Sequence, residues 1–169
     1  MVELFLVRHG ETEENADRIL QGHIPGRLSA SGREQVVALR KRLEHEHFDV
    51  LIASDLQRTM DSASILNEAF ALPVVALPLL RERDWGSFTG RHIDEVQGID
   101  FPPDVESVSA MERRASLFLQ YLRTHHDGQR VLAVGHGLFN RCIQSVLFGR
   151  PMRDIERMSN AEVRILHVV

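Results

Sequence analysis

The chain has 169 residues, 43% of them hydrophobic, which is enough for one globular domain with a sizeable core and too few for two. The net charge of −4 argues against a nucleic-acid binder or an anionic-membrane binder, because such proteins usually carry a basic surface. The single cysteine, Cys142, excludes an internal disulfide and any metal site built from several cysteines, and we expect it to be buried.

The N-terminal apolar run is far too short for a signal peptide or a membrane span, and no basic region precedes it. We therefore expect a cytoplasmic protein in which residues 1–169 form a single domain. The sequence favours neither a monomer nor a homodimer.

The first apolar run stops abruptly at polar residues. Leu4–Val7 predicts a buried strand, which Arg8, His9 and Gly10 follow directly. We expect Gly10 to adopt a backbone conformation that other residues avoid and to let an oxyanion approach closely. A strand end with a basic side chain, followed by a helix N-terminus, suits a phosphate group.

The next predicted helix begins after Thr12, a suitable N-cap, and runs through Ile19. The polar segment from Gln21 to Gly26 reads as a loop over the mouth of a site. A second helix follows Ser29, and its apolar positions give it one buried face.

Val50–Ala53 predicts the second strand, and we expect Ser54–Asp55 to cap a helix that continues to Phe70. Arg58 falls in the first turn of that helix. Its guanidinium could reach back over the strand end and hold an anion. The alternative is a surface ion pair with Asp61.

Val74–Leu77 predicts a short strand, after which the chain turns polar around Glu82. Glu82 is either half of an exposed salt bridge or an acid beside a bound phosphate. We expect Trp85 and Phe88 to pack the following loop against the body, with a pocket wall as the alternative. The segment 93–103 is irregular and offers little cover for a substrate.

The second half of the chain contributes a helix over 106–124 and a final edge strand near Val163–Val168. Arg113 and Arg114 are adjacent on that helix and therefore face different directions, so we expect both to be solvated.

The run Val131–Val134 repeats the design of the first motif. It is followed by Gly135, His136 and Gly137, and then by an apolar helix pattern. Two strand-end histidines, each followed by glycine and a helix, can converge on one site at the carboxyl edge of a parallel sheet.

Strands alternate with helices throughout, which predicts an α/β fold: a three-layer sandwich with a mostly parallel central sheet and helices on both faces. The carboxyl ends of parallel strands lie at one rim of the sheet. Five residues that follow strands are therefore expected to meet there: Arg8, His9, Arg58, Glu82 and His136.

These residue types together predict phosphoryl transfer. A neutral imidazole nitrogen of His9 can attack phosphorus if Arg8 and Arg58 absorb the charge of the phosphoryl group. The two arginines are expected to lower the pKa of His9 and so keep it unprotonated. Glu82 would donate a proton to the leaving oxygen and then activate water. Because the arginines supply positive charge, we expect no metal and no cofactor.

Five separated motifs resemble the histidine phosphatase superfamily, the phosphoglycerate-mutase-like group, in that family's order. The motifs are Leu6–Thr12 with Asn15, Leu28–Gly32, Ser54–Arg58, Glu82 before Trp85-Gly86, and Gly135–Gly137. The resemblance implies a phosphohistidine on His9 and proton donation by Glu82. It also implies phosphate contacts from Arg8, Arg58 and His136. Four further residues would line the pocket: Asn15, Gln21, Gly22 and Gly137.

Within that family the chain is more similar to small phosphatases of the α-ribazole phosphatase type than to the mutases. Only 53 residues separate Glu82 from His136 and 33 follow it, whereas the mutases carry a long insertion and a C-terminal tail. Gln21 also stands where mutases usually have Thr. We therefore expect an open, watery pocket that hydrolyses a phosphomonoester, either one small metabolite or a broad range. A phosphoglycerate mutase, a phosphohistidine-protein phosphatase and a phosphoprotein-binding module remain as alternatives.

Overall fold

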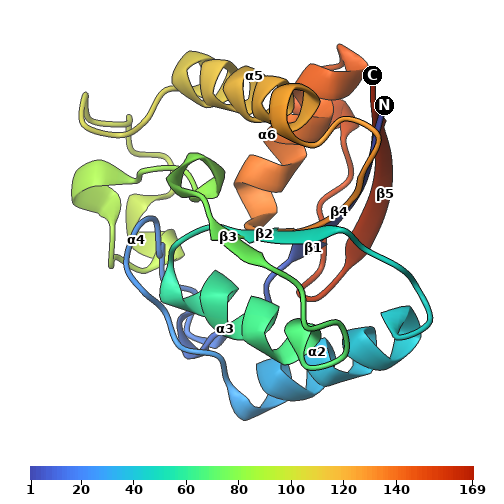
Figure 1. Ribbon diagram of the computed structural model, residues 1–169. Coiled ribbons are helices and arrows are strands. Elements are labelled where there is room, and N and C mark those ends of the chain that lie inside the picture. The colour runs from blue at the N-terminus through green and yellow to red at the C-terminus, as the bar shows by residue number, and fades with distance from the viewer.

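The computed structural model describes all 169 residues, and a five-stranded sheet lies between two layers of helices (Figure 1). The strand order is β3-β2-β4-β1-β5. The strands are β1 (Val2–Arg8), β2 (Val50–Ala53), β3 (Val74–Ala76), β4 (Arg130–Gly135) and β5 (Val163–Val168). The first four are parallel, and β5 runs antiparallel to β1 at the edge. The predicted α/β fold with a mostly parallel sheet is confirmed.

Helices cover both faces of the sheet (Figure 1). One layer holds α2 (Ala30–Leu43) and α3 (Gln57–Asn67), and the other holds α5 (Val108–His125) and α6 (Gly137–Phe148). The single-turn helices α1 (Glu13–Ala16) and α4 (Ile93–Val96) lie in loops. No helix combines the length and the apolar character that crossing a bilayer would require.

The core forms on both sides of the sheet because side chains alternate along the strands. Leu4 and Leu6 of β1 pack with residues of α5 and α6, whereas Phe5 and Val7 pack with residues of α2 and α3. Cys142 is buried in the first of these clusters, as expected. Since β1 is packed on both faces, the residues that follow it are held rigidly.

The register of the sheet brings the two histidine motifs together. Arg8 of β1 is paired with Gly135 of β4, and the His9 amide donates to the Gly135 carbonyl at 3.1 Å. On the other side of β4, the Ser54 amide donates to the Val134 carbonyl at 3.1 Å. Three chain segments that are far apart in sequence therefore end side by side.

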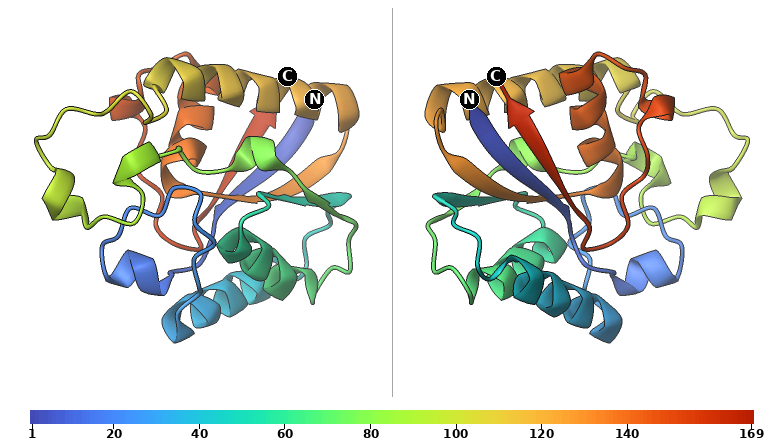
Figure 2. Two further views of the ribbon diagram at one scale, coloured as in Figure 1. Left: turned by 90° about the vertical axis from the view of Figure 1, so that its left-hand side faces the viewer. Right: turned by 90° about the vertical axis from the view of Figure 1, so that its right-hand side faces the viewer.

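Two loops extend beyond this end of the sheet. One carries α1 and the other carries α4, and both views of Figure 2 show them on the same side of the molecule. Ile19 forms a bridge with His92, and the Leu20 amide donates to the Arg91 carbonyl at 2.9 Å. The loops are thus tied to each other beside the strand ends.

The first predicted helix is wrong in its length. Thr12 is the N-cap, as predicted, and its side chain accepts from the Asn15 amide, but α1 ends at Ala16 and does not reach Ile19. Arg18 adopts a left-handed backbone with φ of 57°, which turns the chain out of the helix. Ile19 is then free to pair with the other loop.

Both predicted ends of α3 also need correction. Its N-cap is Leu56, because Ser54–Asp55 makes other contacts described below. The helix ends at Asn67 and does not continue to Phe70. The Asn67 side chain accepts from the Leu72 amide and donates to the Leu72 carbonyl, which closes the chain into a turn.

Candidate active site

A cavity of about 460 Å³ lies at the carboxyl ends of the parallel strands. This volume is within the range of small-molecule sites. The charged residues of its wall are four arginines and one carboxylate: Arg8, Arg58, Arg141, Arg157 and Glu82. The wall is therefore cationic, although the whole chain has a net charge of −4.

His9 lines this cavity and is almost completely buried. Its Nδ1 lies 2.6 Å from the Gly10 carbonyl oxygen. A carbonyl can only accept, so Nδ1 carries the proton and Nε2 keeps its lone pair. Burial lowers the pKa of His9 to about 3, with Arg58 and Arg8 acting in the same direction and the Gly10 carbonyl opposing them. The predicted direction is right, but burial is a larger cause than the arginines.

Gly10 is required for a different reason from the one predicted. It does not have a positive φ. Instead, a Cβ at this position would lie 2.6 Å from the Gly32 carbonyl oxygen and 2.8 Å from the side chain of Val36. Glycine at position 10 thus allows the turn after His9 to pack directly against the start of α2.

His136 lies behind His9 and is completely buried, with 5.3 Å between the two ring centroids. Its Nε2 is 2.7 Å from the Ser54 hydroxyl, which is itself 2.8 Å from the Thr59 hydroxyl. Its Nδ1 is buried without a partner. Burial holds the pKa of His136 well below its ordinary value, and the neighbouring Arg58 and His9 add to this effect. The ring is therefore neutral and is oriented by a hydroxyl group.

Sequence reasoning missed this role of Ser54 because a serine shortly before a helix is also typical of an N-cap. The strand register shows why Ser54 faces His136, since β2 and β4 are neighbours in the sheet. The other predicted cap residue, Asp55, instead forms a two-pronged salt bridge with Arg81, at 2.7 and 2.6 Å.

Arg8 lies over the N-terminus of α6. Its Nη1 donates to the Met158 carbonyl at 2.8 Å, while its Nε is buried without a partner. A Cβ on Gly137 would lie 2.9 Å from that Nε. The absence of a side chain at position 137 therefore lets the guanidinium approach the start of the helix.

Arg58 is 1% exposed and does not pair with Asp61, whose partner is Gln57. The Arg58 guanidinium donates to the Gly22 carbonyl at 2.8 Å and to the Ile24 carbonyl at 2.5 Å, and its Nε is buried without a partner. Gly22 therefore holds Arg58 in place and does not itself line the cavity. Burial lowers the pKa of Arg58 to about 10, opposed by Glu82, so the group stays charged near neutral pH.

Asn15 and Gln21 line the cavity, and the side-chain nitrogen of each makes no hydrogen bond within the protein. The Asn15 Oδ1 accepts from the Thr12 amide at 3.1 Å and from Asn160 at 3.4 Å. The Gln21 Oε1 accepts from the Thr12 hydroxyl at 3.0 Å. Because both oxygens are occupied, the amide groups present N–H donors, which suit an oxyanion.

Glu82 lies against the first turn of α6. Its Oε2 accepts from the Leu138 amide at 3.1 Å, and its Oε1 accepts from the Phe139 amide at 3.0 Å and from the Arg83 amide at 2.8 Å. The Leu138 and Phe139 amides are among the unpaired N–H groups at the N-terminus of α6. Glu82 is thus part of the cavity wall and not the exposed salt bridge considered as its alternative.

The segment that carries Glu82 is held by Arg114 of α5. The guanidinium of Arg114 donates to the Arg81 carbonyl at 2.6 Å and to the Leu79 carbonyl at 3.0 Å. It also pairs with Glu106 at 2.8 Å and lies 3.8 Å from the centre of the Phe139 ring. One side chain thereby connects α5, α6 and the chain leading into Glu82.

The prediction that Arg114 is solvated is therefore wrong, whereas Arg113 is exposed as expected. A signal was present in the sequence. Arg114 stands three residues after the buried Met111, so it shares the apolar face of the helix.

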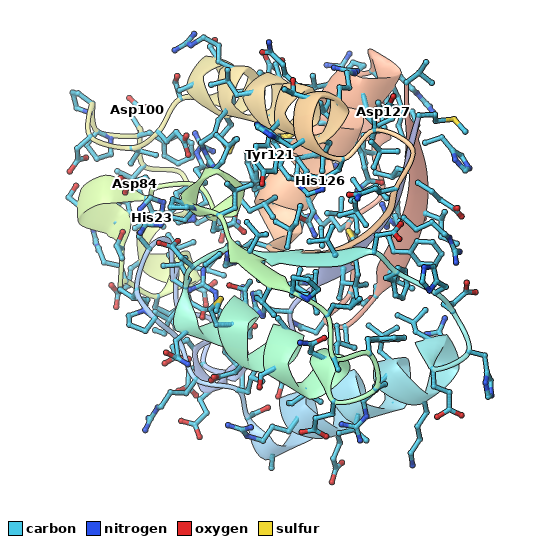
Figure 3. All side chains as sticks on the ribbon, viewed as in Figure 1. His23, Asp84, Asp100, Tyr121, His126 and Asp127 are labelled. Carbon is cyan, nitrogen blue, oxygen red and sulfur yellow. The ribbon has the colours of Figure 1, made fainter.

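His23 was also missed. Its Nε2 lies 2.9 Å from the Glu82 carbonyl oxygen, so it ties the loop after α1 to the segment of Glu82. In Figure 3, His23 and Asp84 both lie at the side where the loops extend, and Asp127 lies toward the opposite side.

The rest of the cavity wall is largely apolar. Trp85 lines the cavity, which is the alternative considered for this residue. Phe88 instead packs the loop, in a small cluster with Val96 and Val105. The other apolar lining residues come from the two loops, from α6 and from the chain before β5: Ile19, Leu20, Ile93, Leu138 and Met158.

The fold and the cavity define an α/β protein with a cationic cavity at the carboxyl ends of parallel strands. The profile of the histidine phosphatase superfamily (branch 1) matches residues 4–169. The chain belongs to this family, which confirms the resemblance seen in the five motifs.

Individual relatives include both phosphatases and a mutase. The "Probable phosphoglycerate mutase GpmB" of Enterobacter sp. (strain 638) is 33% identical over 165 residues, which cover 89% of this chain and 77% of that protein. The crystal structure of the alpha-ribazole phosphatase from Shigella flexneri has a TM-score of 0.85 and 28% identity, over 94% of this chain and 86% of its own. Bacillus stearothermophilus YhfR has a TM-score of 0.92 and 27% identity, over 99% of this chain and 91% of its own.

Proposed function

We propose that this protein is a phosphatase that hydrolyses phosphomonoesters through a phosphohistidine on His9. One observation carries the proposal: the unprotonated Nε2 of His9 lies in a cavity whose neighbouring groups are N–H donors. These groups are Arg8, Arg58, Asn15 and Gln21. Such a wall suits the oxygens of a phosphoryl group.

In the first step, the Nε2 of His9 attacks phosphorus and the bond between phosphorus and the ester oxygen breaks. The low pKa of His9, about 3, means that the nucleophile needs no prior deprotonation. Arg8 and Arg58 stabilise the charge on the phosphoryl oxygens. Glu82 gives its proton to the leaving oxygen, so the alcohol departs neutral. The Oε2 of Glu82 accepts only from the Leu138 amide, so its second lone-pair site can carry this proton.

In the second step, the Glu82 carboxylate takes a proton from water as the water oxygen attacks phosphorus. The bond between phosphorus and Nε2 breaks, which releases phosphate and restores the neutral imidazole. Arg8 and Arg58 provide the positive charge that a metal ion would otherwise supply at the phosphoryl group, so we propose metal-independent catalysis. Activity that is lost in a chelator and restored by a divalent ion would contradict this part of the proposal.

The central test is substitution of the nucleophile. We expect His9→Ala to abolish hydrolysis of 4-nitrophenyl phosphate, and we expect brief incubation with a labelled phosphomonoester to leave an acid-labile, base-stable phosphoenzyme in the wild type only. His45→Ala is the matched control, because His45 is an exposed histidine at the end of α2. Turnover retained by the His9 variant would reject the assignment.

A phosphoglycerate mutase is the second candidate, because the GpmB relative is 33% identical to this chain. A mutase returns the phosphoryl group to its substrate instead of to water. A coupled assay primed with a bisphosphoglycerate separates the two, since only a mutase interconverts phosphoglycerate isomers faster than it releases phosphate.

Two further candidates differ in what they do with a phosphoprotein. A phosphohistidine-protein phosphatase would release phosphate from a phosphohistidine protein faster than from any small ester. A binding module would need no acid, so Glu82→Gln would leave its affinity largely intact. In an enzyme we expect the same substitution to slow turnover by about a hundredfold or more.

A further inference from the structure

The cavity wall holds more positive charge than one phosphoryl group requires. Four guanidinium groups face one carboxylate. Arg8 and Arg58 lie beside His9, so a phosphomonoester dianion there accounts for their charge. Arg141 and Arg157 are left over, and neither pairs with a carboxylate, although eight other arginines of the chain do.

Arg141 is fixed in place one helical turn away from the phosphoryl position. It stands four residues after Gly137 on α6, which is about 6 Å along the helix axis. Its Nε donates to the Ile155 carbonyl at 2.6 Å. This single backbone contact orients the side chain and leaves both of its terminal nitrogens free.

Arg157 comes from the chain between α6 and β5, which is anchored to the site just after this residue. The next residue, Met158, is buried and its carbonyl accepts from Arg8 at 2.8 Å. Slightly further on, Asn160 donates to the His9 carbonyl at 3.2 Å. Arg157 is itself exposed and makes no side-chain hydrogen bond, so its charge is available at the cavity mouth.

The wall also provides apolar surface for the body of a substrate. Trp85, Ile93 and Leu138 line the cavity together with Ile19 and Leu20. Arg83 stacks at 4.7 Å from the Trp85 ring centre and so holds that ring in place. A leaving group that joins an apolar or aromatic body to an anion would match both kinds of surface.

We infer that Arg141 and Arg157 form a second anion subsite, which selects phosphomonoesters whose leaving group carries its own negative charge. The inference rests on the proposed phosphatase function and adds its substrate class. A carboxylate and a second phosphate share the relevant chemistry, since both accept N–H donors from a guanidinium.

The test compares substrates that differ chiefly in that charge. The pair is 4-carboxyphenyl phosphate and 4-carbamoylphenyl phosphate, which have nearly the same shape. We expect the wild type to prefer the carboxylate by about tenfold in kcat/KM, which is the combined effect of roughly two partly exposed ion pairs. An aryl phosphate bearing a 4-phosphonomethyl group shows whether a phosphonate is preferred to the carboxylate. Equal kcat/KM for the anionic and neutral substrates would overturn the inference.

Variants locate the effect. In Arg141→Gln/Arg157→Gln we expect the preference for the carboxylate to fall to nearly onefold, and in Arg141→Lys we expect most of it to return. The readout is the ratio between the two substrates, so a general change in activity does not affect it. Arg153→Gln is the matched control, because Arg153 is an exposed arginine of the same chain segment that does not line the cavity. A preference that survives in the double variant would reject the assigned residues.

Binding separates this inference from the proposed function. (4-Carboxybenzyl)phosphonate and (4-carbamoylbenzyl)phosphonate are not hydrolysed, and titration calorimetry measures their Kd values directly. If 4-nitrophenyl phosphate is not hydrolysed, the proposed function fails, but tighter binding of the carboxylate that depends on Arg141 and Arg157 would still support the subsite. Equal Kd values would exclude it.

Discussion

At the scale of single residues, the site depends on keeping two imidazoles neutral in the presence of arginine. Removing His9 and His136 from water disfavours their protonated forms more strongly than the nearby guanidinium groups do. The hydrogen bonds on the far side of each ring then decide which nitrogen is available. For His9 the partner is the Gly10 carbonyl, and for His136 it is the Ser54 hydroxyl.

Gly137 gives a prediction at this scale. A Cβ there would lie 2.9 Å from the Nε and 3.1 Å from the Cζ of Arg8, so Gly137→Ala should push the guanidinium aside. We expect kcat/KM for 4-nitrophenyl phosphate to fall by about tenfold or more, the loss of one charged hydrogen bond. The free energy of unfolding should not fall, because alanine favours a helix and the end of the Arg8 side chain can move. A stable variant with full activity would contradict this role of Gly137.

At the scale of elements, the sheet register positions the two histidines, and helices α5 and α6 position Glu82. The pairing of β1, β4 and β2 sets His9, His136 and Ser54 next to one another. Glu82 does not follow a strand of the sheet directly, because a short 3₁₀ turn over Pro78–Leu80 comes between. Its position depends instead on α5, through Arg114, and on the N-terminus of α6.

Two adjacent arginines on α5 test this dependence. Arg114→Ala removes the bonds to the Leu79 and Arg81 carbonyls and leaves Glu106 without its partner. We expect the free energy of unfolding to fall by about 2 kcal/mol and turnover to fall with it. Arg113→Ala should change stability by less than about 0.5 kcal/mol, because Arg113 is exposed. Urea denaturation and phosphate release measure both effects, and similar results for the two variants would contradict the assignment.

At the scale of the whole molecule, the charge distribution separates the surface from the site. The chain is acidic overall, with a net charge of −4, yet the wall of its main cavity carries four arginines and one carboxylate. A small anion is therefore attracted to the cavity although the chain as a whole is acidic.

Burying neutral histidines also makes the stability of the protein depend on pH. In the unfolded chain His9 takes up a proton near pH 6.5, whereas in the folded protein it does so only near pH 3. Between these values the unfolded state binds more protons than the folded state. The full stability is therefore present above pH 6.5, and stability is lost through His9 as the pH falls toward 3. By pH 5 the loss from His9 is about 2 kcal/mol.

The corresponding measurement is urea denaturation at pH 7 and pH 5. We expect the wild type to lose about 2 kcal/mol more than His9→Asn between these two values, because the variant has no imidazole at this position to protonate. His136 remains in both proteins, so its own contribution cancels in the comparison. Equal losses in the two proteins would show that His9 is not kept neutral by the fold.

The sequence by itself determined the fold class and which polar residues stand at the ends of the strands. Apolar runs that end at Arg8-His9-Gly10 and Gly135-His136-Gly137 predict parallel strands with reactive ends, because burial and strand geometry are local properties of the pattern. The family followed from the same motifs. Glu82 was identified in this way too, although its contacts with α6 were not.

Only the tertiary structure decided which polar residues face the site and which support it. Ser54 and Arg114 have the local pattern of a helix cap and of a solvated arginine, and the packing of neighbouring strands and helices gives them other partners. Arg141 and Arg157 join the cavity from elements that no motif marks. Which side chains converge depends on contacts between distant segments, and local pattern carries no information about those contacts.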